Sequence, residues 1–212
     1  MAAPCFHVWT YPTPTVVLGC SQRSLRGAIQ ARLPAGLAVL DRPSGGGAVL
    51  TGPWLVSVSV VLPPGHTWVR GNLPDSYHQL GLLHTEVLAS LGVAAQALPP
   101  PAVAEANARL GPVVDWACYG SLAPWELVDA QGRKLVGLAQ RRQRNGILLV
   151  AGTLVSTPPW PLLCEALDRP QDAPALQRRT VSCETLAASP CDAQRLALAL
   201  QQALEHALAV AD

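Results

Sequence analysis

Runs of apolar residues, many of them β-branched or aromatic, predict short strands at several places along the chain. The predicted strands are residues 6–11, 15–19, 37–40, 54–62, 125–128, 133–140 and 146–155. The run 54–62 is rich in valine, which suits the interior of a sheet. A Pro-Thr-Pro turn joins the first two strands, and only Asp129–Gly132 separates 125–128 from 133–140, so that pair is expected to form a hairpin.

Apolar residues at three- and four-residue spacing predict two long helices. The first begins at Asp75, and the second covers about residues 190–210 with Ser189 as its expected N-cap. Shorter helices are expected after Ser21 and over 162–167. Strands that come in runs, with helices interspersed, favour an α+β (mixed α/β) fold in which a mixed β-sheet is flanked by helices.

The length of 212 residues suits a single domain, 1–212. The Ala- and Pro-rich stretch 94–115 predicts an irregular excursion from it. Half of the residues are hydrophobic and the net charge is +1, so a strongly basic field that would attract nucleic acid or an anionic membrane is not expected. The first residues, Met1–Cys5, do not resemble a signal peptide, and we expect a cytoplasmic protein with free thiols.

Lys134 is the only lysine among fifteen basic residues. It lies in the apolar, glycine-flanked segment Gly132–Gln140. Lysine is a compact charge whose pKa responds to burial, whereas arginine is a rigid fork that stays protonated. Lys134 is therefore either a candidate for chemistry that arginine cannot supply or a lysine that persists by chance on an exposed strand edge.

Three further segments carry candidate chemistry. Residues 42–49 place an arginine before three glycines, which either cradle a ligand or form a plain hairpin turn. Gly152 lies in a strand where its missing side chain permits close approach. Cys118 lies sixteen residues before Lys134, and it is either a nucleophile with a lowered thiol pKa or a buried inert thiol.

Taken together and in this order, these segments resemble the lipoate–protein ligase and octanoyltransferase family over about residues 5–187. The resemblance rests on V-x-L-G-x-x-Q at 16–22, R-x-S-G-G-G-A-V at 42–49, G-R-K-x-x-G-x-A-Q-x-R at 132–142 and G-T-L at 152–154. It implies a biotinyl/lipoyl protein ligase-like domain with an acyl chain lying over the sheet. No metal site is expected, because the six cysteines lack zinc spacing.

The resemblance also implies roles for particular residues. The glycine-rich segment would bind the acyl group and its activated head through Arg42, Ser44, Gly45, Gly46, Gly47, Ala48 and Val49. Lys134 would bind the acyl carbonyl, and an ammonium in a dry tunnel would stabilise developing oxyanion charge there. Gly137 and Ala139 would keep the tunnel floor narrow, and Gly152 would allow close approach.

The segment Trp116–Leu127 separates the two branches of this family. It resembles the Cys-Phe-x-x-Pro-x-x-(Tyr/Trp)-Glu segment of thiol-dependent octanoyltransferases, in which the cysteine takes octanoyl from acyl carrier protein. The acyl group then passes to a lysine of a lipoyl domain or of the glycine-cleavage H protein, and no cofactor is required. The alternative is an ATP-dependent lipoate ligase, in which Arg133 or the Arg141–Arg142 pair would meet phosphate and ATP with Mg²⁺ would be the cofactor.

A third possibility is a non-catalytic relative that binds acyl groups or lipoyl domains. Three departures from the family pattern motivate it: Thr51 and Ala151 stand where histidine is frequent, and Leu138 replaces a small serine. The exposed-looking cluster Arg141, Arg142 and Arg144 is either a solvated rim or a clamp for a phosphate or an acidic partner surface.

Overall fold

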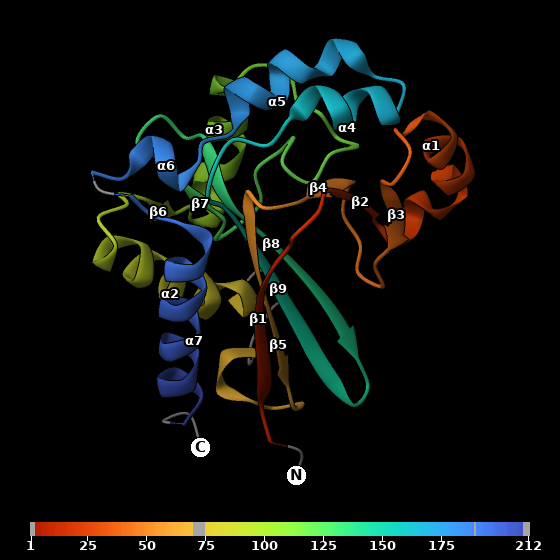
Figure 1. Ribbon diagram of the computed structural model, residues 1–212. Helices are drawn as coiled ribbons and strands as arrows, with labels where there is room; N and C mark the ends of the chain where they lie inside the picture. The colour runs from red at the N-terminus through yellow and green to blue at the C-terminus, as the bar shows by residue number, and fades with distance from the viewer. Residues whose placement is uncertain (1–2, 70–74, 189, 210–212) are drawn as a thin grey trace.

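A computed structural model describes residues 3–69, 75–188 and 190–209 (Figure 1). Within them the strands form a six-stranded antiparallel sheet, in the order β1-β5-β9-β8-β7-β6, and a three-stranded sheet, β3-β2-β4. In the small sheet β2 is parallel to β3 and antiparallel to β4. The strands are β1 (Cys5–Thr10), β2 (Thr15–Leu18), β3 (Ala38–Asp41), β4 (Val49–Thr51), β5 (Leu55–Leu62), β6 (Gln96–Ala97), β7 (Leu127–Val128), β8 (Lys134–Gln143) and β9 (Gly146–Leu154).

Two long helices, α2 and α7, cover one face of the large sheet, and the small sheet lies on its other side (Figure 1). The α-helices are α1 (Arg26–Arg32), α2 (His78–Ser90), α3 (Val103–Arg109), α4 (Trp160–Ala166), α5 (Ala173–Arg179), α6 (Cys183–Leu186) and α7 (Ala193–Ala209). Short 3-10 turns precede several of them. In the described ranges no helix has both the length and the apolar character needed to cross a bilayer.

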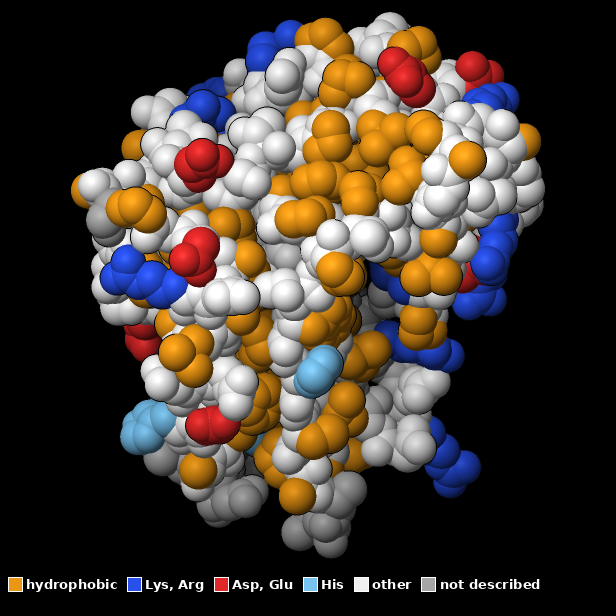
Figure 2. Space-filling model, viewed as in Figure 1, with side chains coloured by type: hydrophobic (Ala, Val, Ile, Leu, Met, Phe, Trp, Pro, Cys, Tyr) orange, Lys and Arg blue, Asp and Glu red, His pale blue; other side chains and the backbone are white. Residues whose placement is uncertain are grey.

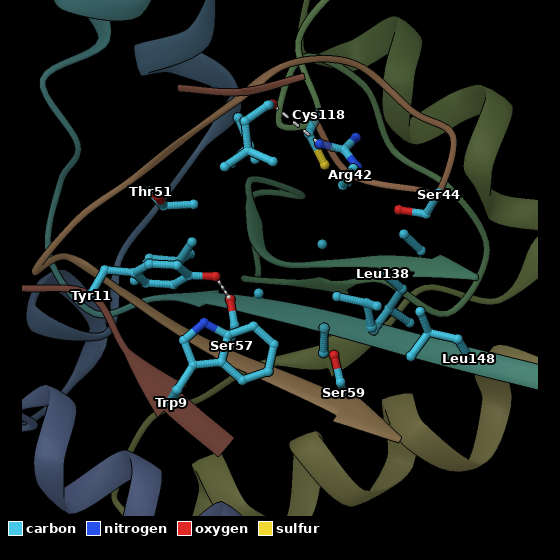
Figure 3. A pocket seen from close by; sticks show the side chains of 18 of the residues that line it. Trp9, Tyr11, Arg42, Ser44, Thr51, Ser57, Ser59, Cys118, Leu138 and Leu148 are labelled. Carbon is cyan, nitrogen blue, oxygen red and sulfur yellow. Dashed lines mark hydrogen bonds between the residues drawn. The ribbon is translucent and has the colours of Figure 1, made fainter. Parts of the chain in front are cut away.

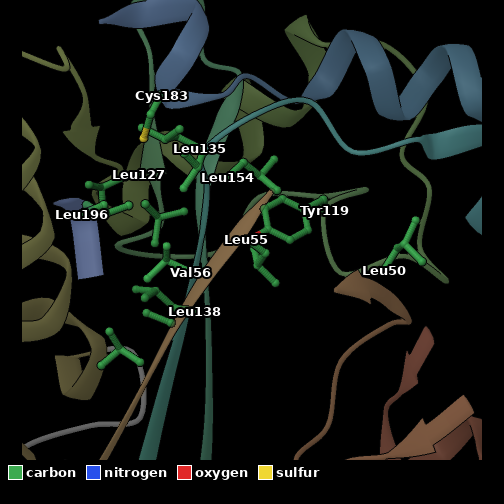
Figure 4. Packing of buried hydrophobic residues seen from close by; sticks show 14 of the residues in the cluster. Leu50, Leu55, Val56, Tyr119, Leu127, Leu135, Leu138, Leu154, Cys183 and Leu196 are labelled. Atoms are coloured by element: carbon green, nitrogen blue, oxygen red, sulfur yellow. The ribbon is translucent and has the colours of Figure 1, made fainter. Parts of the chain in front are cut away.

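Strand alternation explains why the large sheet has two different faces. In β5, Val56, Val58 and Val60 are buried against the helices, whereas the residues between them face the small sheet. The core on the helix side includes Val56, Leu127, Leu135 and Leu196 (Figure 4). The opposite face is left for a cavity between the two sheets.

The predicted strands and the α+β class are confirmed, with differences that have physical causes. The β7–β8 hairpin forms as expected, and β9 pairs with β8. The strands are divided between two sheets, and only the small one is mixed; β1 and β2 lie in different sheets because β1 pairs with the distant β5. The prediction that residues 94–115 are irregular is wrong, since this stretch contains β6 and α3. The helix expected over 190–210 is α7, and Ser189 lies outside the described residues.

Buried His84 on α2 predicts acid sensitivity. Its Nδ1 lies 2.8 Å from the Leu80 carbonyl oxygen, and burial lowers the pKa of the imidazole to about 4. Because the unfolded state binds this proton more tightly, stability should fall as the pH drops from about 6.5 towards 4, by up to about 3 kcal/mol. Urea unfolding at pH 7 and pH 5 should show this loss, and His84→Leu should reduce it; an equal loss in the variant would contradict the assignment.

Candidate active site

A cavity of about 290 Å³ lies between the two sheets and is lined mainly by apolar side chains (Figure 3). Its floor is the helix-free face of the large sheet. Cross-strand register places Trp9, Ser57, Gly152 and Gly137 in one row across four strands. The next row contains Ser59, Val150 and Ala139. Glycines and serines on this floor leave the space that larger residues would fill.

The Cys118 thiol belongs to the cavity lining and is half-buried. Its segment pairs with the glycine-rich loop through two backbone hydrogen bonds. The Cys118 N–H donates to the Ala48 carbonyl oxygen (2.8 Å), and the Ala48 N–H donates to the Trp116 carbonyl oxygen (2.7 Å). Gln22 adds a side-chain hydrogen bond to the same Trp116 oxygen (2.9 Å). These contacts fix the backbone on which the candidate nucleophile stands.

Gly47 is required for this pairing, because a Cβ there would collide with the Trp116 carbonyl and lie 2.7 Å from the Ala117 carbonyl carbon. Gly47→Ala should therefore force the loop and the Cys118 segment apart. We expect a loss of about 1–3 kcal/mol in unfolding free energy and a marked loss of acyl transfer. Gly45→Ala is the matched control, since its Cβ would meet nothing within 4 Å. Equal behaviour of the two variants would contradict this account.

Arg42 binds the glycine-rich loop itself. Its guanidinium donates to the carbonyl oxygens of Gly45 (3.0 Å) and Gly47 (2.6 Å), and more weakly to that of Val17 (3.4 Å). It also belongs to the cavity lining. In this structure the arginine shapes the loop, and its expected contact with a substrate head group stays a prediction.

Lys134 is buried, with 2% of its surface exposed. Its ammonium donates to the carbonyl oxygens of Cys118 (2.7 Å) and Ser121 (3.1 Å) and lies 2.6 Å from Glu126 Oε1. The reading as an exposed-edge lysine is therefore wrong. Lys134 is not one of the described residues that line the cavity, so its expected contact with an acyl carbonyl stays a prediction.

A β-bulge aims Lys134 towards this segment. Leu127 is opposite Val136 and Val128 is opposite Lys134, so Leu135 is an extra residue on β8. Lys134 and Gly137 would otherwise point to opposite faces, because they are three residues apart. With the bulge, the Lys134 side chain lies on the same face as Gly137: a Cβ placed on Gly137 would lie 3.1 Å from Lys134 Cε.

Glu126 belongs to the segment that resembles the octanoyltransferases, but the sequence patterns assigned it no role. Its buried carboxylate pairs with Lys134 and accepts the N–H groups of Leu138 (3.0 Å) and Ala123 (2.8 Å). Burial raises the pKa of this carboxyl, and the ammonium opposes that rise. The sequence carried a signal that such a residue exists, but not which one it is: a lone lysine in an apolar strand needs a buried anionic partner.

Tyr119 occupies the space above the two floor glycines. Its hydroxyl donates to the Gly152 carbonyl oxygen (2.7 Å), and burial raises the tyrosine pKa well above its usual value. A Cβ on Gly152 would lie 3.0 Å from that hydroxyl, and one on Gly137 would lie 3.6 Å from the ring. The close approach expected at Gly152 is therefore made by Tyr119, which directly follows Cys118.

Polar groups lie at the β1 end of the cavity, and the sequence analysis did not predict them as part of the site. The Tyr11 hydroxyl donates to Ser57 Oγ (2.9 Å), beside Trp9 (Figure 3). Thr51, one of the departures from the family pattern, is buried and donates to the Thr15 carbonyl oxygen (3.1 Å). Its hydroxyl thereby joins β4 to β2.

The structure thus brings most of the expected site residues to one cavity. Those on its lining are Arg42, Ser44, Val49, Cys118, Gly137, Ala139 and Gly152. Gly45, Gly46, Gly47, Ala48 and Lys134 do not line it, but all of these except Gly46 hydrogen-bond to Arg42 or Cys118 of the lining. In the described part of the chain, no group of three or more His, Cys, Asp or Glu residues is arranged to hold a metal ion.

Comparison with known proteins identifies relatives over nearly the whole chain. An octanoyltransferase LipM of Kyrpidia tusciae is 30% identical over 211 residues, covering 97% of this chain and 76% of the relative. An octanoyltransferase LipM of Brevibacillus brevis is 27% identical over 205 residues, covering 95% and 72%.

Solved structures share the fold. A chain from the bipartite lipoate protein ligase and E2 lipoyl domain system of Thermoplasma acidophilum superposes with a TM-score of 0.67 at 17% identity, covering 97% of this chain and 71% of that one. A lipoate-protein ligase A bound with ATP gives 0.65 at 18% identity, covering 97% and 73%. Both confirm the expected ligase-like fold. The lipoyl protein ligase A/B catalytic domain model matches residues 1–184, and this chain therefore belongs to that family.

Proposed function

We propose that this chain is an octanoyltransferase of protein lipoylation that works through a thioester on Cys118. The observation that carries the proposal is the Cys118 thiol on the wall of an apolar cavity, held by the glycine-rich loop. The described lining contains one ionic side chain, Arg42, and no His, Asp, Glu or Lys. Such a lining suits an apolar acyl chain that arrives already activated.

The reaction has two steps of covalent catalysis. The Cys118 thiolate attacks the thioester carbonyl of an octanoyl-loaded acyl carrier protein, a new sulfur–carbon bond forms, and the carrier thiolate leaves and takes up a proton. The neutral amine of an acceptor lysine then attacks the Cys118 thioester, the sulfur–carbon bond breaks as the amide forms, and the proton lost by the nitrogen passes to the departing Cys118 sulfur or to solvent. The acceptor would be a lipoyl domain or the glycine-cleavage H protein.

In this proposal Lys134 and Glu126 act through the backbone. The ammonium binds the carbonyls of Cys118 and Ser121, and the carboxylate binds the Ala123 N–H, so the pair holds the segment 118–126 against β8. Gly137, Ala139 and Gly152 supply the floor for the acyl chain.

Three related inferences belong to the proposal. The 212 residues act as one domain, the transferase needs neither ATP nor a metal ion, and the reaction takes place in the cytoplasm. Support for the transferase over the ATP-dependent ligase comes from the relatives named octanoyltransferase.

A transfer assay separates the two activities. Octanoyl-loaded acyl carrier protein and a lipoyl domain should yield octanoylated acceptor without ATP. Product that forms only when ATP and a free fatty or lipoic acid are supplied would overturn the proposal in favour of the ligase. Binding of either protein with no product under both conditions would favour the non-catalytic relative.

A further inference from the structure

The β8–β9 hairpin carries three arginines that lie close together in the sequence. These hairpin arginines, Arg141, Arg142 and Arg144, are exposed. Among the described side chains, which do not include that of Asp75, none of the three has a carboxylate within ion-pair distance, and Arg142 donates to Ser76 Oγ (2.8 Å). The sequence from 130 to 164 contains no Asp or Glu, although the whole chain has a net charge of only +1. Positive charge is therefore concentrated on this hairpin.

The hairpin borders the cavity. Arg141 is opposite Leu148, and directly opposed residues of neighbouring strands point to the same face. Leu148 lines the cavity, so Arg141 continues the floor where Ala139 ends. Figure 2 shows the surface hollowed beside the projecting hairpin, with basic side chains along its border. The glycine-rich loop, with Ser44, faces the hairpin across this hollow (Figure 3).

We propose that the hairpin arginines dock an acidic surface of the protein that carries the acyl donor. The inference rests on the proposed function, since a protein-borne thioester must reach Cys118 through a cavity bordered by this hairpin. A single exposed ion pair contributes little to affinity. Several like charges beside one opening act together instead, because they steer an oppositely charged partner and raise its association rate.

The test compares two charge-reversed double variants in single-turnover acylation of Cys118. Arg142→Glu/Arg144→Glu alters the hairpin and leaves the cavity-facing Arg141 in place. Arg169→Glu/Arg178→Glu is the matched control: it changes net charge equally at two exposed positions, one before α5 and one within it, and α5 lies at the opposite end of the molecule (Figure 1). Each protein is given octanoyl-loaded acyl carrier protein or the small neutral donor octanoyl-pantetheine.

The hairpin variant should react about tenfold more slowly with the carrier-borne donor at low ionic strength. The difference should shrink in high salt, because exposed charges are screened. Its rate with octanoyl-pantetheine should match that of the control. Equal rates of the two variants with the carrier would overturn the proposal, as would a loss of equal size with both donors. Failure of the unaltered protein to acylate Cys118 from either donor would instead refute the proposed function itself.

Discussion

Cys118→Ser should lower acyl transfer by at least about 10³-fold, as expected when a covalent nucleophile is removed. The serine hydroxyl is nearly the same size, and the backbone bonds between the Cys118 segment and Ala48 do not involve the side chain. Stability should therefore change little. The measurement is the rate of octanoyl transfer to a lipoyl domain, together with urea unfolding of the variant.

Cys20→Ser is the control for this experiment. Cys20 is an exposed free thiol that does not belong to the cavity lining. Transfer by this variant should equal that of the unaltered protein. Full activity of Cys118→Ser would show that the acyl group passes to the acceptor without a cysteine thioester.

Breaking the buried Lys134–Glu126 pair should produce the largest loss of stability. Lys134→Met leaves the Glu126 carboxylate buried without its cation, and Glu126→Gln leaves the ammonium without its anion. Each change should cost about 3–5 kcal/mol of unfolding free energy. The double variant should be more stable than the sum of the two losses predicts, by about 0.5–3 kcal/mol. Urea unfolding of the four proteins measures these terms.

Activity should not recover with stability in the double variant. The carbonyls of Cys118 and Ser121 lose their ammonium donor in it, so acylation of Cys118 should remain slow. Arg133→Met is the comparison. Arg133 pairs with Asp129 in the β7–β8 hairpin, but Arg133 is about one-third exposed. Asp129 also keeps two backbone N–H donors when the arginine is removed. A normal acylation rate in the Lys134–Glu126 double variant would contradict the positioning role.

Local patterns were sufficient for several parts of this structure. The valine-rich run gave β5, and the four-residue connection gave the β7–β8 hairpin. The segment α3 was missed because it has only seven residues, and the residues it packs against, such as Leu122 and Val128, follow much later in the chain. The division into two sheets depends likewise on long-range pairing of β1 with β5.

Part of the candidate site could likewise be predicted from the sequence, and part could not. Family motifs located Cys118 and the glycine-rich loop, and both border the cavity. The partner of Lys134 could not be chosen from fourteen acidic residues, because the ion pair depends on a bulge that rotates the lysine onto the face of Gly137. The position of Tyr119 over the floor glycines likewise follows from cross-strand register, which local sequence does not contain.

Intact-protein mass spectrometry after incubation with octanoyl-loaded acyl carrier protein, without ATP, tests the central claim most directly. The account predicts a mass increase of one octanoyl group that hydroxylamine removes, that maps to Cys118 and that disappears on addition of a lipoyl domain. An unmodified Cys118 under these conditions, with lipoyl-adenylate formed once ATP and lipoate are supplied, would contradict it.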